Sequence, residues 1–241
     1  MSFVPNSFVA ANALKADDAV ARDAFVRDVL ASGVCFVVEG ADGKVRVPSP
    51  RHPGCHVELL WSDRAEATRW ASVLATKSQI RAVALHTLIA EHLPSLTVAS
   101  VFAGPDWSDL PAEPEVTGAE LSYSLRRALA VEFAAAAHTT RQVWLLKDAN
   151  GLVTLTSTLS STAQVLPVFA THEQAASHAT AQIVTPVRQP MAEFLSKTLM
   201  TCIVEHWRLA PAYMPGPDVL ELAPWDMKAL LHGSPQSRRV A

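Results

Sequence analysis

The sequence has few cysteines and lacks the common catalytic motifs. Its 241 residues include only three cysteines, Cys35, Cys55 and Cys202, and so sparse and odd a set does not make a disulfide framework. Free thiols of this kind fit a reducing cytosol. The motifs GxSxG, HExxH, CxxC and GxGxxG are all absent, and with them the usual signatures of esterases, zinc proteases, thiol oxidoreductases and dinucleotide-binding enzymes. We therefore expect a cytoplasmic protein without a cofactor.

The chain also lacks an excess of charge of one sign and any long apolar run. Twenty basic and twenty-three acidic residues give a net charge of −3, whereas a nucleic-acid-binding protein needs a basic surface to neutralise phosphates. No stretch of about 18 uncharged apolar residues exists, so we expect no membrane span. Pro5, Asn6 and Ser7 interrupt the apolar N-terminus too early for a secretory signal. Hydrophobic residues make up 49% of the chain, which excludes disorder for most of it.

The two halves of the chain match one another in order. Ala41-Asp42-Gly43 lies between β-rich runs in the first half, and Ala149-Asn150-Gly151 lies between such runs in the second. Asp-Gly and Asn-Gly at such places predict a hairpin with a type I′ turn, which needs positive φ at both central residues. A strand and a helix follow in each half, with Ser62 and Thr171 as the expected N-caps. This shared order indicates a tandem duplication.

The remainder of each half follows the same plan. A second helix, at 85–93 and 191–199, leads to a β-like run at 96–102 and 201–209 and then to a proline-rich loop and a closing helix. Residues 119–138 contain neither Gly nor Pro, so one helix is expected to join the halves. The predicted organisation is an N-terminal extension at 1–20, a first repeat at 21–129, a second repeat at 130–231 and a flexible tail at 232–241.

Three motifs of the second half follow one another in an order found in a known family. They are Trp144-Leu145-Leu146-Lys147-Asp148-Ala149-Asn150-Gly151, then Leu166-Pro167-Val168-Phe169, then Pro224-Trp225-Asp226. With them the second half resembles the bacterial family called domain of unknown function 2750. The first half resembles it more weakly, because Phe36 replaces the hairpin Trp and 57–60 lacks the proline. A looser similarity is to SseB-like proteins.

The resemblance implies an α+β fold. We expect two tandem related small domains, each a mostly antiparallel sheet that contains a β-hairpin and packs with about three to four helices. The resemblance implies no activity, because the family supplies no catalytic or ligand-binding residues that could be transferred to this chain.

The densest set of potential metal ligands lies at residues 52–56. Its two imidazoles and one thiol, His52, Cys55 and His56, are of the kinds that zinc binds. The second half has Ser161-Thr162-Ala163-Gln164 in the same region, so these ligands are not a property of the repeat. We expect no metal site, and His52, Cys55 and His56 stand as the weak candidate.

Both halves carry an aromatic residue in a proline-rich loop directly after a strand. Prolines stiffen a loop and reduce the entropy lost on binding, and an aromatic ring on such a loop is a common interface anchor. The alternative is a ring that folds back to cover its own core. The predicted partner-binding residues are Pro105, Trp107 and Pro111 in the first half and Pro211, Tyr213 and Pro217 in the second.

Two classes of function remain open. The first is a non-enzymatic protein-interaction or regulatory module with an immunity- or chaperone-like role, which binds a partner protein or forms a homo-oligomer and uses neither nucleic acid nor membrane. The second is a small-molecule binder or unrecognised enzyme with a site in the groove between the halves, since clefts between domains commonly host ligands. Its polar groups would include His52, Cys55, His56 or Arg81.

Overall fold

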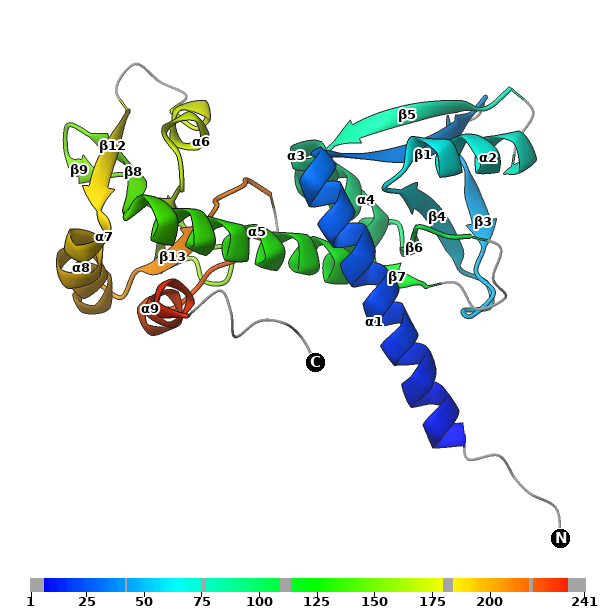
Figure 1. Cartoon of the computed structure of the whole chain (residues 1–241), viewed down its shortest axis with the longest axis horizontal. Coiled ribbons are helices and arrows are strands. Elements are labelled where there is room, and N and C mark those ends of the chain that lie inside the picture. Colours follow the sequence, from blue (N-terminus) through cyan, green and yellow to red (C-terminus); the bar gives the residue numbers. More distant parts are fainter. Residues whose placement is uncertain are drawn as a thin grey trace, which may run out of the picture. The chain divides into compact units, whose positions relative to one another are not determined.

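The computed structural model describes residues 7–41, 43–74, 77–108, 114–179, 184–216 and 219–233. The chain divides into two compact units, Met1–Leu125 and Arg126–Ala241, and Figure 1 shows that each combines helices with β-strands. The α+β fold expected from the sequence is confirmed. Within the described ranges, no helix is both long and apolar enough to cross a membrane.

The first unit is built around one sheet. Strand β4 lies between β1 and β6 and is buried from Val57 to Trp61, which accounts for the apolar residues on either side of Glu58. The pair β4–β6 is parallel, and the other described pairs are antiparallel. The strands are β1 (Val34–Gly40), β2 (Gly43–Lys44), β3 (Arg46–Pro48), β4 (His56–Trp61), β5 (Gln79–Ala84), β6 (Val101–Pro105) and β7 (Val116–Thr117). In Figure 1, β1 and β5 run side by side.

Helices connect and cover these strands. Helix α1 precedes β1, and α2 joins β4 to β5. A further helical segment of three parts, with a π-helical turn in the middle, joins β5 to β6. The helices are α1 (Ser7–Ser32), α2 (Arg64–Leu74), α3 (Leu85–Thr87), the π-helical turn Leu88–His92 and α4 (Leu93–Val98).

The second unit repeats this order of elements. Its strands form two sheets, β12-β8-β9 and β10-β11-β13, with β11 and β13 parallel. The strands are β8 (Gln142–Asp148), β9 (Gly151–Leu152), β10 (Leu155–Thr156), β11 (Gln164–Val168), β12 (Thr185–Pro190) and β13 (Arg208–Pro211). The helices are α6 (His172–Ser177), α7 (Met191–Glu193), the π-helical turn Phe194–Thr198, α8 (Leu199–Val204) and α9 (Pro224–His232).

Helix α5 (Gly118–Thr140) is uninterrupted, as expected for residues 119–138. Its start is a capping box, in which Thr117 Oγ1 accepts from the backbone N–H of Glu120 at 3.1 Å and Glu120 Oε2 accepts from that of Thr117 at 2.9 Å. Arg141, with a φ of 56°, ends it.

The strand registers show which residues of the two units correspond. Leu60 pairs with Pro105 in the first unit, and Val168 pairs with Pro211 in the second. The residue after each of these prolines, Asp106 and Ala212, has a φ of 48°. Because pairing and backbone conformation agree, a residue in one unit can be compared with its counterpart in the other.

Each unit has its own apolar core. In the second unit, Phe133 of α5, Leu166 of β11, Phe194 and Met227 of α9 belong to one buried cluster. In the first unit, Trp61 is buried at the end of β4 beneath α2, together with Val57, Leu59, Ala67 and Trp107.

The hairpin after β8 forms as predicted, but its turn is not type I′. Asp148 pairs with Gly151, and neither Ala149 nor Asn150 has a positive φ, whereas Gly151 has a φ of 132°. The Asp148 carboxylate accepts the N–H groups of Asn150 and Gly151 at 2.7 and 3.0 Å. This Asx turn stabilises a backbone without positive φ at the two central residues, Ala149 and Asn150. The prediction of a type I′ turn is therefore wrong. Asp42, in the corresponding turn, lies outside the described residues.

The β-like runs begin later than predicted. Helix α4 continues to Val98 and α8 to Val204, and the strands start only at Val101 and Arg208. Leu93 and Leu96, three residues apart, bury one face of α4, and this packing outweighs the β propensity of the residues that follow.

The N-cap expected at Thr171 is confirmed, whereas the one at Ser62 is wrong. Thr171 Oγ1 accepts from the backbone N–H of Gln174 at 3.2 Å. At α2 that role falls to Asp63, whose carboxylate accepts from the N–H of Ala65 at 3.2 Å. The Ser62 hydroxyl donates to Asp106 instead.

The close packing around Gly104 on β6 predicts that the effects of substitutions at Gly104 and Trp107 on stability depend on one another. A methyl group there would lie 2.7 Å from Trp107 Nε1 and 2.8 Å from side-chain atoms of Leu59 and Val57. The counterparts of Gly104 and Trp107 are Ala210 and Tyr213, a larger residue beside a smaller ring. Gly104→Ala should therefore lower the free energy of unfolding by about 1–3 kcal/mol, measured by urea denaturation, because it overpacks the core.

The double variant Gly104→Ala/Trp107→Tyr is the control. It should lose less stability than the sum of the two single variants, because the smaller ring makes room for the methyl group. Strictly additive losses would contradict this explanation.

Candidate functional site

The loop after β6 turns its aromatic ring into the core of the first unit. Trp107 is 7% exposed, and its indole N–H donates to the carbonyl of Pro114 at 2.7 Å. Its own carbonyl accepts from the indole of Trp61 at 3.1 Å. The Asp106 carboxylate accepts the backbone N–H and the hydroxyl of Ser62 at 2.7 and 2.9 Å. This ring therefore closes its own core.

The corresponding loop of the second unit leaves its ring half-buried. Tyr213 packs edge-on against His178, whose ring also stacks on Phe169, with centroid distances of 5.4 and 5.2 Å. Burial lowers the pKa of His178. The Arg126 guanidinium donates to the carbonyl of Met214 at 2.7 Å. A hollow beside Tyr213 has room for about one water molecule.

The prolines of both loops were also candidates. Pro105 and Pro211 are buried at the ends of their strands, whereas Pro111 and Pro217 lie outside the described residues. Partner binding by these loops stays a prediction.

The potential metal ligands of the first unit do not converge. The ring of His52 stacks on Phe102 with a centroid distance of 4.3 Å, and its Nε2 lies 4.0 Å from a carboxylate oxygen of Glu115. Cys55 is partly buried and His56 is exposed. Among the described residues, no group of three His, Cys, Asp or Glu side chains could hold a metal ion.

A buried glutamate hydrogen-bonded to a serine occurs at corresponding places in both units. Ser49 Oγ donates to Glu115 at 2.5 Å, and Ser157 Oγ donates to Glu221 at 2.6 Å. Each serine hydroxyl also accepts two backbone N–H groups of its own turn. Because the fold uses this contact twice, we assign it a structural role.

A second set of polar residues, two of them buried, lies in the first unit. Glu58 on β4 and His92 at the end of the π-helical turn have side chains only 1% and 2% exposed. Glu58 lies 2.7 Å from His92 Nε2, 3.6 Å from Lys44 Nζ and 3.4 Å from Arg46 Nε. The Lys44 ammonium also lies 3.2 Å from His92 Nδ1. We call these four residues the charge cluster.

The contacts of His92 define its tautomer. An ammonium group can only donate hydrogen bonds, so Nδ1 accepts from Lys44. The neutral ring then carries its proton on Nε2, which faces Glu58.

The surroundings of Glu58 favour its ionised form. Burial alone would raise the pKa of this carboxyl group, but the contact with His92 and the positive charges of Lys44 and Arg46 outweigh burial and lower the pKa. The carboxylate therefore stays charged in the interior because it has three partners.

The counterparts of these residues in the second unit carry no charge. Lys44, Arg46, Glu58 and His92 correspond to Leu152, Thr154, Leu166 and Thr198. The fold can thus be built with apolar or neutral residues at these positions. Nothing in the sequence analysis pointed to the charge cluster, because its members are spread from β2 to the π-helical turn.

The second unit has a distinguishing surface of its own. Met200, Ile203 and Val204 of α8 are 52%, 43% and 68% exposed, and Trp225 of α9 is 67% exposed. The spacing of the three α8 residues places them on one side of the helix, while Leu199 and Cys202 face the core. Helices α8 and α9 pack against one another. We call these four exposed residues the α8–α9 face.

The first unit does not share this surface. The counterparts of Met200, Ile203, Val204 and Trp225 are Pro94, Thr97, Val98 and Ala119. Only Val98 retains a comparable aliphatic side chain, so the fold does not require the apolar residues of the second unit.

The ionisation of Glu58 predicts a pH-dependent stability. A carboxyl group whose pKa is lower in the folded state stabilises the protein at pH values above its unfolded pKa, about 4.3. That contribution is lost as the pH falls through the folded pKa. The difference in melting temperature between the wild type and Glu58→Gln should therefore be largest near pH 7 and shrink below about pH 4.3. A difference that stays constant or grows on acidification, followed by circular dichroism, would contradict this prediction.

Comparison with known proteins confirms the duplication. The family model described as "Protein of unknown function (DUF2750)" matches the chain twice, over residues 22–125 and 130–231. No curated protein gives a significant sequence match.

Two solved structures show a distant likeness. "Anabaena Tic22 (protein transport)" is 13% identical with a TM-score of 0.25, and the match covers 78% of this chain and 92% of that one. "Tic22 from Plasmodium falciparum" is 10% identical with a TM-score of 0.24, and its match covers 67% of this chain and 81% of that one. Similarity at this level carries no argument about function.

Proposed function

Given that the chain belongs to the DUF2750 family of proteins of unknown function and contains its domain twice, we propose that it is a non-enzymatic protein-interaction module. The contact surface is the α8–α9 face, and the partner is a protein that presents an apolar patch. The exposure of Trp225 on α9, a helix that packs against α8 with its three exposed aliphatic residues, is the observation that carries this proposal.

The composition of the α8–α9 face suits a protein contact. Large apolar side chains gathered on adjacent helices lose unfavourable contact with water when a partner covers them. Tryptophan is among the residues most enriched at the energetic centres of interfaces. In the first unit, Thr97 and Ala119 stand at the positions of Ile203 and Trp225. Its corresponding surface therefore serves as the comparison surface, which the proposal does not expect to bind the partner.

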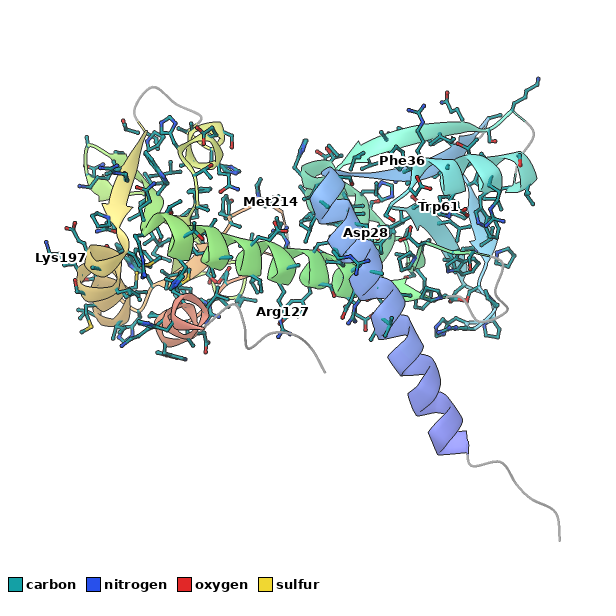
Figure 2. The ribbon with its side chains drawn as sticks, in the orientation of Figure 1. Asp28, Phe36, Trp61, Arg127, Lys197 and Met214 are labelled. Atoms are coloured by element: carbon teal, nitrogen blue, oxygen red, sulfur yellow. The ribbon has the colours of Figure 1, made fainter. Side chains whose placement is uncertain are left out.

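The charges around the face point to apolar rather than ionic recognition. Lys197, which Figure 2 shows pointing away from the second unit, is already paired with Glu193 at 3.1 Å. Asp226 and Lys228 on α9 add one exposed charge of each sign, and the exposed Glu205 directly follows Val204. A set of mixed sign, with a single excess negative charge, offers little attraction to a strongly charged partner. Contact through the proline-rich loops, and a cytoplasmic location, stay predictions.

The proposal predicts a loss of binding when the face takes the residues of the first unit. Ile203→Thr/Trp225→Ala should weaken binding of the partner at least about 30-fold, because truncating a central interface tryptophan costs about 2 kcal/mol or more. The partner is the protein recovered with the wild-type chain from its host, and its affinity is measured by titration with purified components.

The matched control is Val98→Thr/Ala119→Ser in the first unit, which should leave the affinity unchanged. Equal binding by both double variants would overturn the proposal. So would a wild-type homodimer that Ile203→Thr/Trp225→Ala separates into monomers, because the face would then serve self-association.

A further inference from the structure

We propose that two copies of the chain pair through the outer edge of β5, so that the sheets of their first units join across a two-fold axis. This surface lies in the first unit and is separate from the α8–α9 face, so the proposal goes beyond the function proposed above. It rests on the direction of the backbone groups of β5 and on the difference between β5 and its counterpart β12.

Strand β5 lies at an edge of its sheet. It pairs with β1 along its whole length, and no other described strand pairs with it. Figure 1 shows β5 along the upper margin of the first unit, next to β1. Ala82 and Ala84 are exposed and Ile80 is half-buried. An edge strand of this kind leaves a row of backbone N–H and C=O groups that another strand can bind.

The hydrogen bond that follows β5 shows which of its residues turn outward. The N–H of Leu85, the residue directly after β5, donates to the carbonyl of Gly33 at 2.9 Å and so points toward the β1 side. Consecutive residues of an antiparallel strand direct their backbone groups to opposite sides. Counted back from Leu85, every second residue of β5 therefore faces away from β1. These outward-facing residues, which we call the β5 edge, are Ile80, Ala82 and Ala84.

The second unit blocks the same edge. Strand β12 has the register of β5, and the N–H of Met191, directly after it, donates to the carbonyl of Arg141 at 2.9 Å. The outward-facing residues of β12 are therefore Pro186, Arg188 and Pro190. Proline has no N–H, and charged side chains on an edge discourage pairing. The β5 edge has an N–H at all three positions, whereas β12 retains one.

A second copy of the chain complements the β5 edge. With the two-fold axis at Ala82, this residue pairs with itself across the axis, and Ile80 pairs with Ala84 of the other copy. Each such pair of outward-facing residues exchanges two hydrogen bonds. The large side chain of Ile80 then lies opposite a small one, and the symmetry repeats this match on the other side of the axis.

The charges on β5 favour this register. Arg81 is the charged residue of β5, and its guanidinium is paired with the carboxylate of Glu39 at 3.0 Å. The pair is neutral, so an identical edge is not repelled. With the axis at Ala82, Arg81 lies opposite Val83 of the other copy. An axis at Arg81 would instead place two guanidinium groups directly opposite one another, which destabilises a strand pair.

One residue of the second unit can be transferred to the β5 edge without strain. Ala84 has φ and ψ of −63° and 146°, and its counterpart Pro190 has −57° and 141°. The proline ring holds φ near about −65°, and the Ala84 side chain is exposed. The substitution Ala84→Pro should therefore preserve the backbone of the first unit and remove one outward N–H.

The test is sedimentation equilibrium of the full chain over about 1–100 μM, the range in which a complex of micromolar affinity dissociates. The wild type should be a dimer at the upper end of this range. Ala84→Pro should raise its dissociation constant at least about 10-fold, because the symmetric dimer loses two hydrogen bonds. Ala82→Arg/Ala84→Pro, which also places two arginines opposite one another, should be monomeric throughout. A monomeric wild type, or a dimer that both variants retain, would overturn the proposal.

The controls separate pairing from folding and from the α8–α9 face. Both variants should keep the circular dichroism spectrum of the wild type, and Ala82→Arg alone should also weaken the dimer. Arg188→Ala/Pro190→Ala, at the matched positions of β12, should leave the dissociation constant unchanged. Ile203→Thr/Trp225→Ala should dimerise like the wild type. If Ile203→Thr/Trp225→Ala alone separates the dimer, or if a monomeric wild type binds a different protein through the β5 edge, self-pairing is wrong.

A cross-link tests the register. Residues in a hydrogen-bonded antiparallel pair have Cα atoms about 5.5 Å apart, within the span of about 4.4–6.8 Å that a disulfide bridges. Oxidation of Ala82→Cys/Cys55→Ser with diamide should therefore link two copies. Val73→Cys/Cys55→Ser, altered at a 76% exposed residue of α2, is the matched control. Equal rates of cross-linking in the two variants would contradict a two-fold axis at Ala82.

Discussion

The parallel pairing of two strands is the constraint on which the structure of each unit depends. Strands β4 and β6, and β11 and β13, meet so that a proline ends the second strand and a residue with positive φ follows it. Parallel neighbours need a long crossover, which in both units consists of a helix, a strand and the helical segment with its π-helical turn. The same pairing sets Glu58, on β4, within reach of His92, at the end of that turn.

The two units share one fold but differ in the residues at several corresponding positions. The buried serine–glutamate hydrogen bond occurs in both, whereas the charge cluster and the α8–α9 face each occur in one. Buried ion pairs are seldom more stabilising than apolar residues of similar size, and exposed tryptophan adds nothing to a core. The two units therefore carry different residues at corresponding positions of the same fold, as Leu166 and Glu58 show.

The sequence predicted what depends on local patterns. The duplication, the hairpin at Asp148–Gly151 and the long helix α5 follow from internal matching, turn residues and the lack of Gly and Pro, whereas the α+β class was implied by the family resemblance. The helix ends and the site depend on contacts distant in sequence. Burial of Leu93 and Leu96 extends α4 into an expected strand, and the charge cluster unites residues from four elements. The sequence suggested His52 and Cys55 because they lie only three residues apart, whereas no sequence pattern connects Glu58 with His92.

Thermal unfolding of one variant tests most directly whether the first unit can fold without the charge cluster. The variant Lys44→Leu/Arg46→Thr/Glu58→Leu/His92→Thr gives the first unit the residues of the second. We expect a cooperative transition at or above the wild-type temperature, because apolar residues replace a buried ionic group as a set. A transition lowered by about 10 °C or more, or no cooperative transition, would show that the fold of the first unit requires the cluster.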